Sequence, residues 1–179
     1  EQIPCDHLVL AVGHSARDTF EMLHSEGIPM ERKPFAMGVR IEHKQETISA
    51  RQYGQAWDKL PPSDYKLACH LPDGRSAFTF CVCPGGKVVA AASEPGQLVT
   101  NGMSYRARDG ENINGGFLVG VNPEDFDGDD VLAGCELQRQ IEQKAYQIAD
   151  GAVPITTVGN FVFGDTAQLG TVKPTIKPD

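Results

Sequence analysis

Apolar residues recur along the chain with two different periods, and the change from one period to the other predicts a mixed fold. Residues 8–12 are Leu-Val-Leu-Ala-Val, a wholly apolar run that is typical of a strand buried on both faces of a parallel sheet. Residues 34–43 instead alternate between apolar and polar side chains, which predicts a half-buried strand. Between these two strands, Gly13 permits a sharp turn and Ser15 is a suitable N-cap for a short helix.

Short strands joined by turns are predicted for the middle of the chain. Residues 65–71 and 76–83 flank a Pro-Asp-Gly turn signal that would place Cys69 opposite Phe78. Together with the elements at both ends, they predict an α+β fold, a mainly antiparallel sheet with hairpins that is covered by one long helix and a shorter N-terminal helix. The other predicted elements are a short helix at 46–54, strands at 97–102, 115–122 and 156–165, and the longest helix at 131–150 with Arg139, Glu142 and Lys144 facing water.

Two cysteines one residue apart stand directly before a Pro-Gly-Gly sequence, and three interpretations of them stay open. A primed turn at the two glycines would make a hairpin with Cys83 opposite Val88 and with Phe80 on the core side. Cys81 and Cys83 would then be small buried side chains. A disulfide between them is disfavoured, because residues two apart on a strand have Cα atoms about 6.5–7 Å apart. Metal binding with a neighbouring Cys-His pair, or a redox or substrate-facing role for Cys83, are the alternatives.

Composition and charge narrow the classes of function. The 179 residues carry a formal net charge of -8 with a pI near 5.1, which argues against a general affinity for nucleic acid or anionic membranes. No apolar run approaches the roughly 20 residues of a membrane span. The odd number of cysteines, five, favours reduced thiols and a cytoplasmic location. Cysteine spacing departs from zinc motifs and Asp130 replaces the glycine of a calcium loop at 125–136, so we predict no metal site.

Isolated polar residues provide the candidates for binding. Arg40 lies on the less apolar side of its strand, where it would meet an anion, an internal acid or water. The long polar segment at 101–115 offers Asn101 and Arg106 to a ligand, although an exposed charged loop is the more common explanation. His14 lies in a strand-to-helix turn, where ligands commonly approach. By themselves, these residues indicate an α/β domain that presents a ligand-binding face.

Three longer motifs carry a resemblance to a known family. They are residues 9–43 (beginning VLAVGHSARDTF), 80–89 (FCVCPGGKVV) and 99–109 (VTNGMSYRARD). Together they resemble the uncharacterised bacterial FAD-dependent dehydrogenases, over about residues 6–150. The resemblance implies FAD as the cofactor of a full-length oxidoreductase. Because no Gly-x-Gly-x-x-Gly follows a strand in this sequence, it also implies that the main flavin-binding segment belongs to another part of that protein.

The resemblance further implies a division of the chain. Residues 1–14 would be the last strand and turn of a flavin-binding domain, 15–165 a substrate or cap domain, and 166–179 a displaced or disordered tail. Contacts with FAD in the full-length protein are expected at Ala11, Val12, Gly13, His14 and Ser15. The substrate-facing candidates are Arg40, Cys83, Asn101 and Arg106.

Two functions of different classes follow. In the first, the chain is the cap domain of a FAD-dependent dehydrogenase and is inactive alone. Its partners are the flavin-binding domain of the same full-length chain and a small-molecule substrate of unknown identity. Separated from that domain, its apolar face would be exposed and would favour a homodimer. In the second, the chain is a non-catalytic ligand- or protein-binding domain.

Overall fold

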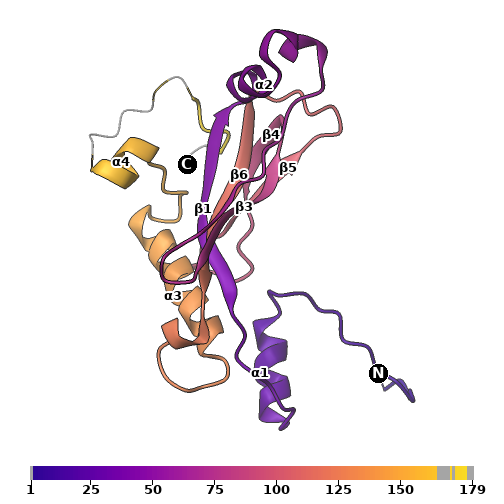
Figure 1. The fold of residues 1–179 in the computed structure, drawn as a ribbon. Coiled ribbons are helices and arrows are strands. Elements are labelled where there is room, and N and C mark those ends of the chain that lie inside the picture. The colour runs from indigo at the N-terminus through magenta and orange to yellow at the C-terminus, as the bar shows by residue number, and fades with distance from the viewer. Residues whose placement is uncertain (1, 165–169, 171, 177–179) are drawn as a thin grey trace.

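The computed structural model describes residues 2–164, 170 and 172–176. At its centre is a four-stranded antiparallel sheet with the order β1-β6-β3-β2, and a two-stranded antiparallel pair, β4-β5, lies beside it (Figure 1). This architecture confirms the predicted α+β fold with a mainly antiparallel sheet. In chain order the elements are α1 (Arg17–Ser25), β1 (Phe35–Lys44), α2 (Gln45–Tyr53), η1 (Gly54–Lys59), β2 (Ala68–His70), β3 (Ser76–Cys83), β4 (Gly86–Ala90), β5 (Thr100–Ser104), β6 (Asn112–Val121), η2 (Pro123–Asp125), α3 (Ala133–Ile148) and α4 (Val158–Phe163).

β1 and β6 form the longest strand pair and place the buried part of the sheet. They are paired along their whole length, from Phe35 opposite Val121 to Lys44 opposite Asn112. The half-buried strand predicted at residues 34–43 is confirmed, because most of β1 is of intermediate exposure. β6 is fully buried at its start, where Ile113 has no exposed surface. The deepest part of the sheet is therefore the end at which β6 begins.

The buried strand predicted at residues 8–12 is not formed in the structure of this chain. These residues form no strand and belong to the N-terminal arm, residues 2–15, which extends away from the sheets (Figure 1). Leu8 is 75% exposed and Val9 is 86% exposed. An apolar strand needs neighbouring strands to satisfy its backbone groups, and no described segment pairs with this one.

Two further predictions of local structure are wrong. Ser15 does not cap α1, because the N-cap position is Ala16 and no side chain caps this helix. The strand predicted at residues 156–165 is wrong, since its centre forms α4. Thr157 caps that helix by accepting a backbone N–H, and Gly164 ends it in the left-handed conformation. Among the described residues, no helix combines the length and hydropathy needed to cross a bilayer.

The hairpin predicted at Gly85-Gly86 is also wrong. β3 pairs with β6 and β4 pairs with β5, so the two strands belong to different sheets. β3 contains a bulge between Phe80 and Cys83, where Cys81 adopts a φ of 48°. The extra residue changes the side to which the following side chains point. Phe80, which precedes the bulge and was expected in the core, is 61% exposed, whereas Cys83 and Val88 are buried.

The register of β2 and β3 differs from the prediction by one residue. Cys69 lies opposite Ala77 rather than Phe78. The connecting turn is closed by a hydrogen bond from the Leu71 N–H to the Arg75 carbonyl (2.8 Å). Three residues, 72–74, thus lie inside this turn, whereas Cys69 opposite Phe78 would have required a turn of two residues.

Part of the C-terminal tail is bound to the sheet. Residues 165–169, 171 and 177–179 lie outside the described residues. The Thr175 hydroxyl donates to Glu42 Oε1 (2.6 Å), and the Thr175 N–H donates to Glu42 Oε2 (3.1 Å). The Asn112 side-chain amide donates to the Lys173 carbonyl (2.8 Å). The expectation of a displaced or disordered end is therefore wrong for residues 172–176.

Candidate functional site

Arg40 is the centre of a polar cluster built from four strands. Its guanidinium extends from β1 and donates from Nη1 to Asn114 Oδ1 on β6 (2.5 Å) and to the Cys81 carbonyl on β3 (3.3 Å). From Nη2 it donates to Asn101 Oδ1 on β5 (3.5 Å). One guanidinium thus joins the four-stranded sheet to the β4-β5 pair. We call Arg40, Cys81, Asn101 and Asn114 the Arg40 cluster.

Two features of the backbone give the Arg40 side chain its place. The bulge in β3 holds Cys81 in the left-handed region, which residues with a Cβ seldom adopt, and the carbonyl of this residue accepts from the guanidinium. On β5, Gly102 is buried, and a Cβ there would overlap Arg40 Nη1 and Asn114 Oδ1. Glycine is needed at this position because of the close approach. Local strain held by surrounding structure is a common property of functional sites.

Asn114 is the member of the cluster that the sequence analysis missed. Its side chain is completely buried, and its Oδ1 accepts from Arg40 while its Nδ2 has no partner among the described residues. A buried donor without an acceptor is unfavourable by about 1–3 kcal/mol. The sequence did contain a signal, because Asn112 and Asn114 alternate with Ile113 and must share one face of a strand.

Cys83 lies beside the cluster as a protonated thiol. It is buried, and its Sγ donates to the Cys81 carbonyl (3.4 Å). Burial raises the pKa of Cys83, Cys81 raises it further, and the charge of Arg40 opposes the rise in part. A thiol with a raised pKa is a poor nucleophile at neutral pH. Both cysteines of the motif are free thiols, and within the described part of the chain no three His, Cys, Asp or Glu side chains lie close enough together to hold a metal ion.

The remaining predicted site residues lie outside the Arg40 cluster. Arg106 is exposed in the turn after β5, and no side-chain hydrogen bond or ion pair with another described residue includes it. The predicted FAD contacts, Ala11 to Ser15, are all exposed in the N-terminal arm. No atom lies within 4 Å of the position that a Cβ at Gly13 would occupy. The arm alone therefore forms no walls around a flavin, and a flavin site there requires another part of a longer protein.

Arg17, at the start of α1, is the centre of a second cluster of a different kind. Its buried guanidinium donates to both carboxylate oxygens of Glu142 (2.8 and 3.1 Å). It also donates to Gln97 (3.0 Å), Gln138 (3.2 Å) and Glu94 (3.4 Å). The bond to Glu142 is the main cause of the raised pKa of Arg17, and burial acts in the opposite direction. We call these five residues the Arg17 network, which fastens α1 to α3.

The polar side of α3 is used for packing, contrary to the prediction that it faces water. Glu142 belongs to the Arg17 network, and Arg139 donates to Glu21 of α1 (2.6 Å). Of the three residues predicted to face water, Lys144 is exposed as expected. Ile141, an apolar residue of the same helix, is 45% exposed. The helix itself is confirmed, but ion pairs with distant segments decide which of its sides is covered.

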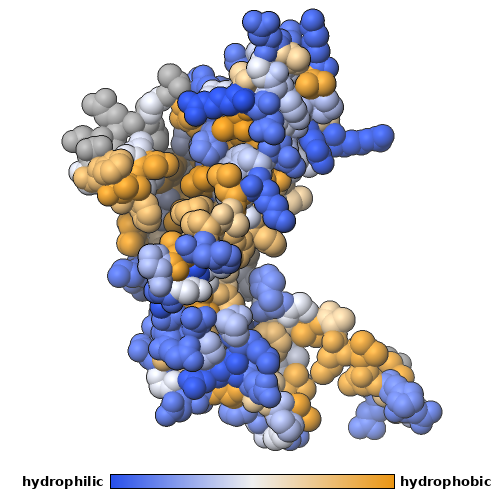
Figure 2. Space-filling view, viewed as in Figure 1, coloured by the Kyte–Doolittle hydropathy of each residue, from blue (hydrophilic) through white to orange (hydrophobic). Residues whose placement is uncertain are grey.

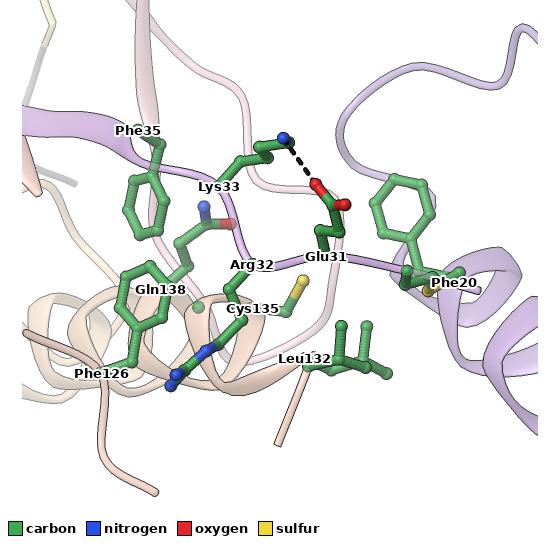
Figure 3. Close-up of a pocket in the computed structure, with 12 residues that line it drawn as sticks. Phe20, Glu31, Arg32, Lys33, Phe35, Phe126, Leu132, Cys135 and Gln138 are labelled. Carbon is green, nitrogen blue, oxygen red and sulfur yellow. Dashed lines mark hydrogen bonds and ion pairs between the residues drawn. The ribbon is translucent and has the colours of Figure 1, made fainter. Parts of the chain in front are cut away.

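A pocket of about 300 Å³ lies between α1, the segment before β1 and the start of α3 (Figure 3). Phe20 lines one side, and the stacked rings of Phe35 and Phe126, with centroids 5.4 Å apart, line the other. Cys135 lies between them, and burial raises the pKa of its thiol. The ion pair between Lys33 and Glu31 at the rim is exposed to solvent. Arg32 also lines the pocket and donates one hydrogen bond to the Gly128 carbonyl (3.1 Å), whereas the Arg40 guanidinium is held by three hydrogen bonds from three other strands. We therefore regard the Arg40 cluster as the candidate site.

Comparison with known proteins places the chain in a family. Residues 34–179 match the model of the family described as FAD-dependent protein, C-terminal domain-like. The chain belongs to this family. The match includes every residue of the Arg40 cluster and begins after the N-terminal arm and α1. It confirms the resemblance to FAD-dependent proteins at the level of the family, and it extends through the predicted tail.

A longer bacterial relative supports the same assignment. An uncharacterized protein of Clostridium beijerinckii is 48% identical over 180 residues, which represent 97% of this chain and 34% of the relative. The chain thus spans about a third of the length of the curated relative that it matches. Because this alignment covers 97% of the chain, it includes most of the N-terminal arm, which the family model does not match.

Proposed function

We propose that the chain is the substrate-binding, or cap, domain of a FAD-dependent oxidoreductase and acts with a flavin-binding domain of the same full-length protein. The observation that carries the proposal is the convergence of four strands on the guanidinium of Arg40. Polar groups that converge from a rigid sheet are typical of binding sites. Three of the predicted substrate-facing residues, Arg40, Cys83 and Asn101, lie at or beside this point, and we keep Arg106 as a fourth on the basis of its motif alone.

In this proposal the residues of the chain bind and orient the substrate, and FAD supplies the electron-transfer chemistry when it is bound. Arg40 provides a cation held in place by neutral acceptors. Cys83 provides a neutral thiol beside it. The N-terminal arm would form the last strand of the flavin-binding domain and contact FAD through Ala11 to Ser15. The exposed apolar residues of the arm support this assignment, because they need a neighbouring sheet.

The proposal is tested by the flavin absorbance of the full-length protein, measured for the wild type and for Gly13→Val. The matched control is Gly27→Val. Gly13 and Gly27 have similar positive φ values, 80° and 76°, and neither has an atom within 4 Å of the position of an added Cβ. Backbone strain should therefore be alike in the two variants, and only Gly13→Val should lose the flavin.

The two parts of the proposal fail separately in this experiment. Full-length protein that never binds flavin would overturn the oxidoreductase assignment and leave the alternative of a non-catalytic ligand- or protein-binding domain. A yellow protein in which Gly13→Val and Gly27→Val retain equal flavin would overturn only the contact between the arm and FAD.

Exposed apolar side chains support the presence of a covering neighbour. They gather on the N-terminal arm and around α4 (Figure 2). Large exposed apolar patches commonly mark an interaction surface. The proposal therefore expects the isolated chain to form a homodimer, and light scattering of a monomer at high concentration would count against this. The residues concerned include Leu8, Val9, Leu10, Val158, Phe161 and Phe163.

A further inference from the structure

The hydrogen bonds of Arg40 leave one edge of its guanidinium free. A guanidinium carries five N–H donors in a planar fork. Two Nη1 donors bond to Asn114 and Cys81, and one Nη2 donor bonds to Asn101. The Nε–H and the second Nη2 donor bond to no other described residue. The Nε–H and one of the two Nη2 donors lie on the same edge of the planar group, and such a pair can receive a carboxylate side-on.

The Nε atom of Arg40 keeps some contact with solvent. Among the described residues, Arg17 Nε is a buried nitrogen without a hydrogen-bond partner. Arg40 Nε does not belong to this class of buried, unpartnered atoms. The Arg40 side chain is itself of intermediate exposure. Its opposite edge is held by Asn114, which is completely buried, so the direction of the free edge is fixed by the sheet.

The charge of Arg40 has no acidic partner. Arg17, Arg75 and Arg139 each form an ion pair with a carboxylate. In the part of the chain that the structure describes, Arg40 forms none, and its three acceptors are two amide oxygens and a backbone carbonyl. A fixed cation with neutral supports and a free fork is suited to an anion from outside the domain.

The cluster is suited to a single negative charge. No second Lys or Arg side chain among the described residues bonds to Asn101, to Asn114 or to the Cys81 carbonyl. The nearby Cys83 thiol is held in its neutral form by burial. One planar cation matches the two oxygens and single charge of a carboxylate, whereas a phosphate dianion is more commonly bound by several cations.

We propose that Arg40 binds a carboxylate group of the substrate through its Nε and Nη2 edge, so that the substrate is a small carboxylic acid. That the bound acid is a substrate rests on the proposed function, whereas the anion site itself depends only on the contacts of Arg40 described above.

The test is isothermal titration of the full-length protein with sodium benzoate, with sodium phosphate and sodium chloride as comparison anions. Arg40→Lys keeps the charge but loses the fork, and Arg51→Lys makes the same change at an exposed position of α2. We expect saturable benzoate binding that Arg40→Lys weakens by about tenfold or more and that Arg51→Lys leaves unchanged. Gly102→Ala, which displaces Arg40 without removing it, should weaken binding as well, whereas Gly120→Ala should not.

Each result decides the carboxylate site, and flavin absorbance of the same samples decides the proposed function separately. Absence of saturable benzoate binding, preference for phosphate, or equal affinity in Arg40→Lys would overturn the carboxylate site even in a yellow protein. Should Arg40→Lys be unfolded in a thermal melt, equal affinity in Gly102→Ala and Gly120→Ala would overturn it. A colourless protein that binds benzoate through Arg40 would keep the site and reject the oxidoreductase.

Discussion

Arg17 and Arg40 solve the same problem of placing a cation inside the fold in opposite ways. Both guanidiniums gather acceptors from segments far apart in the sequence. The acceptors of Arg17 include two carboxylates, so its charge is neutralised and the group is almost fully buried. Among the described residues the acceptors of Arg40 are all neutral, so its charge is oriented but not neutralised by them. Neutralised cations fasten structure, and oriented but unpaired ones are available to a ligand.

Replacing Arg17 by Met should have the largest effect on stability, because it leaves Glu142, whose side chain is only 14% exposed, without its cation. Removing one partner of such a pair typically lowers the free energy of unfolding by about 3–5 kcal/mol. Denaturant unfolding measures the loss, and Arg51→Met on the exposed side of α2 serves as the control, with an expected change below about 0.5 kcal/mol. A loss below about 1 kcal/mol for Arg17→Met would mean that the ion pair of Arg17 does not anchor the structure.

Adding a methyl group at Gly102 tests the packing around Arg40 without removing the charge of its guanidinium. The new Cβ would overlap Arg40 Nη1 and Asn114 Oδ1, and overpacking of this kind lowers stability by about 1–3 kcal/mol. At Gly120 the nearest atoms lie 3.9 Å from the added Cβ, on Ser76, so Gly120→Ala should be nearly neutral. Thermal unfolding of both variants makes the comparison, and equal melting temperatures would mean that β5 does not pack on the cluster as described.

Replacing Arg40 by Met should destabilise the fold less than the same change at Arg17. The change removes three hydrogen bonds and leaves the Asn114 oxygen without its donor, but it creates no unpaired buried charge. We expect a loss of about 1–3 kcal/mol in the free energy of unfolding. A loss as large as that of Arg17→Met, measured under the same conditions, would show that Arg40 is also a structural anchor.

The smallest effect on stability is expected at the ion pair between Arg75 and Asp125, which lies near the surface. Arg75 donates to both carboxylate oxygens of Asp125 (2.7 and 2.8 Å), and these bonds lower the pKa of Asp125. Because the folded pKa lies below the unfolded one, the stabilisation is present above the unfolded value and is lost as the pH falls through the folded value. Melting temperatures followed into acid should therefore fall slightly less steeply in Asp125→Asn. Parallel curves for the two proteins would contradict this.

The sequence predicted those elements that depend on local pattern. Alternation identified β1, and helical spacing identified α3, because each pattern comes from one segment of chain. The partners of each segment could not be predicted in the same way. β4 pairs with β5 instead of β3, and Glu142 bonds to an arginine more than a hundred residues away instead of facing water. Both results depend on distant contacts, which overrule local preference.

The candidate site shows the same limit. Arg40, Cys83 and Asn101 were predicted separately, each from its own motif, and the fold brings them together. Asn114 was missed because a polar residue in a strand gives no indication of the cation that will bond to it. Its alternation with Asn112 indicated only that two amides share a face.

The bulge in β3 also has a consequence for chemical labelling. On a regular strand Cys81 and Cys83 would share one face and react alike, but the bulge leaves Cys81 exposed and Cys83 buried. A thiol reagent under native conditions should therefore modify Cys81 long before Cys83. Cys81 is the residue whose carbonyl supports Arg40, so a fluorophore attached there would report on the surroundings of the guanidinium. Replacement of the exposed Cys5 and Cys69 would make that reporter selective.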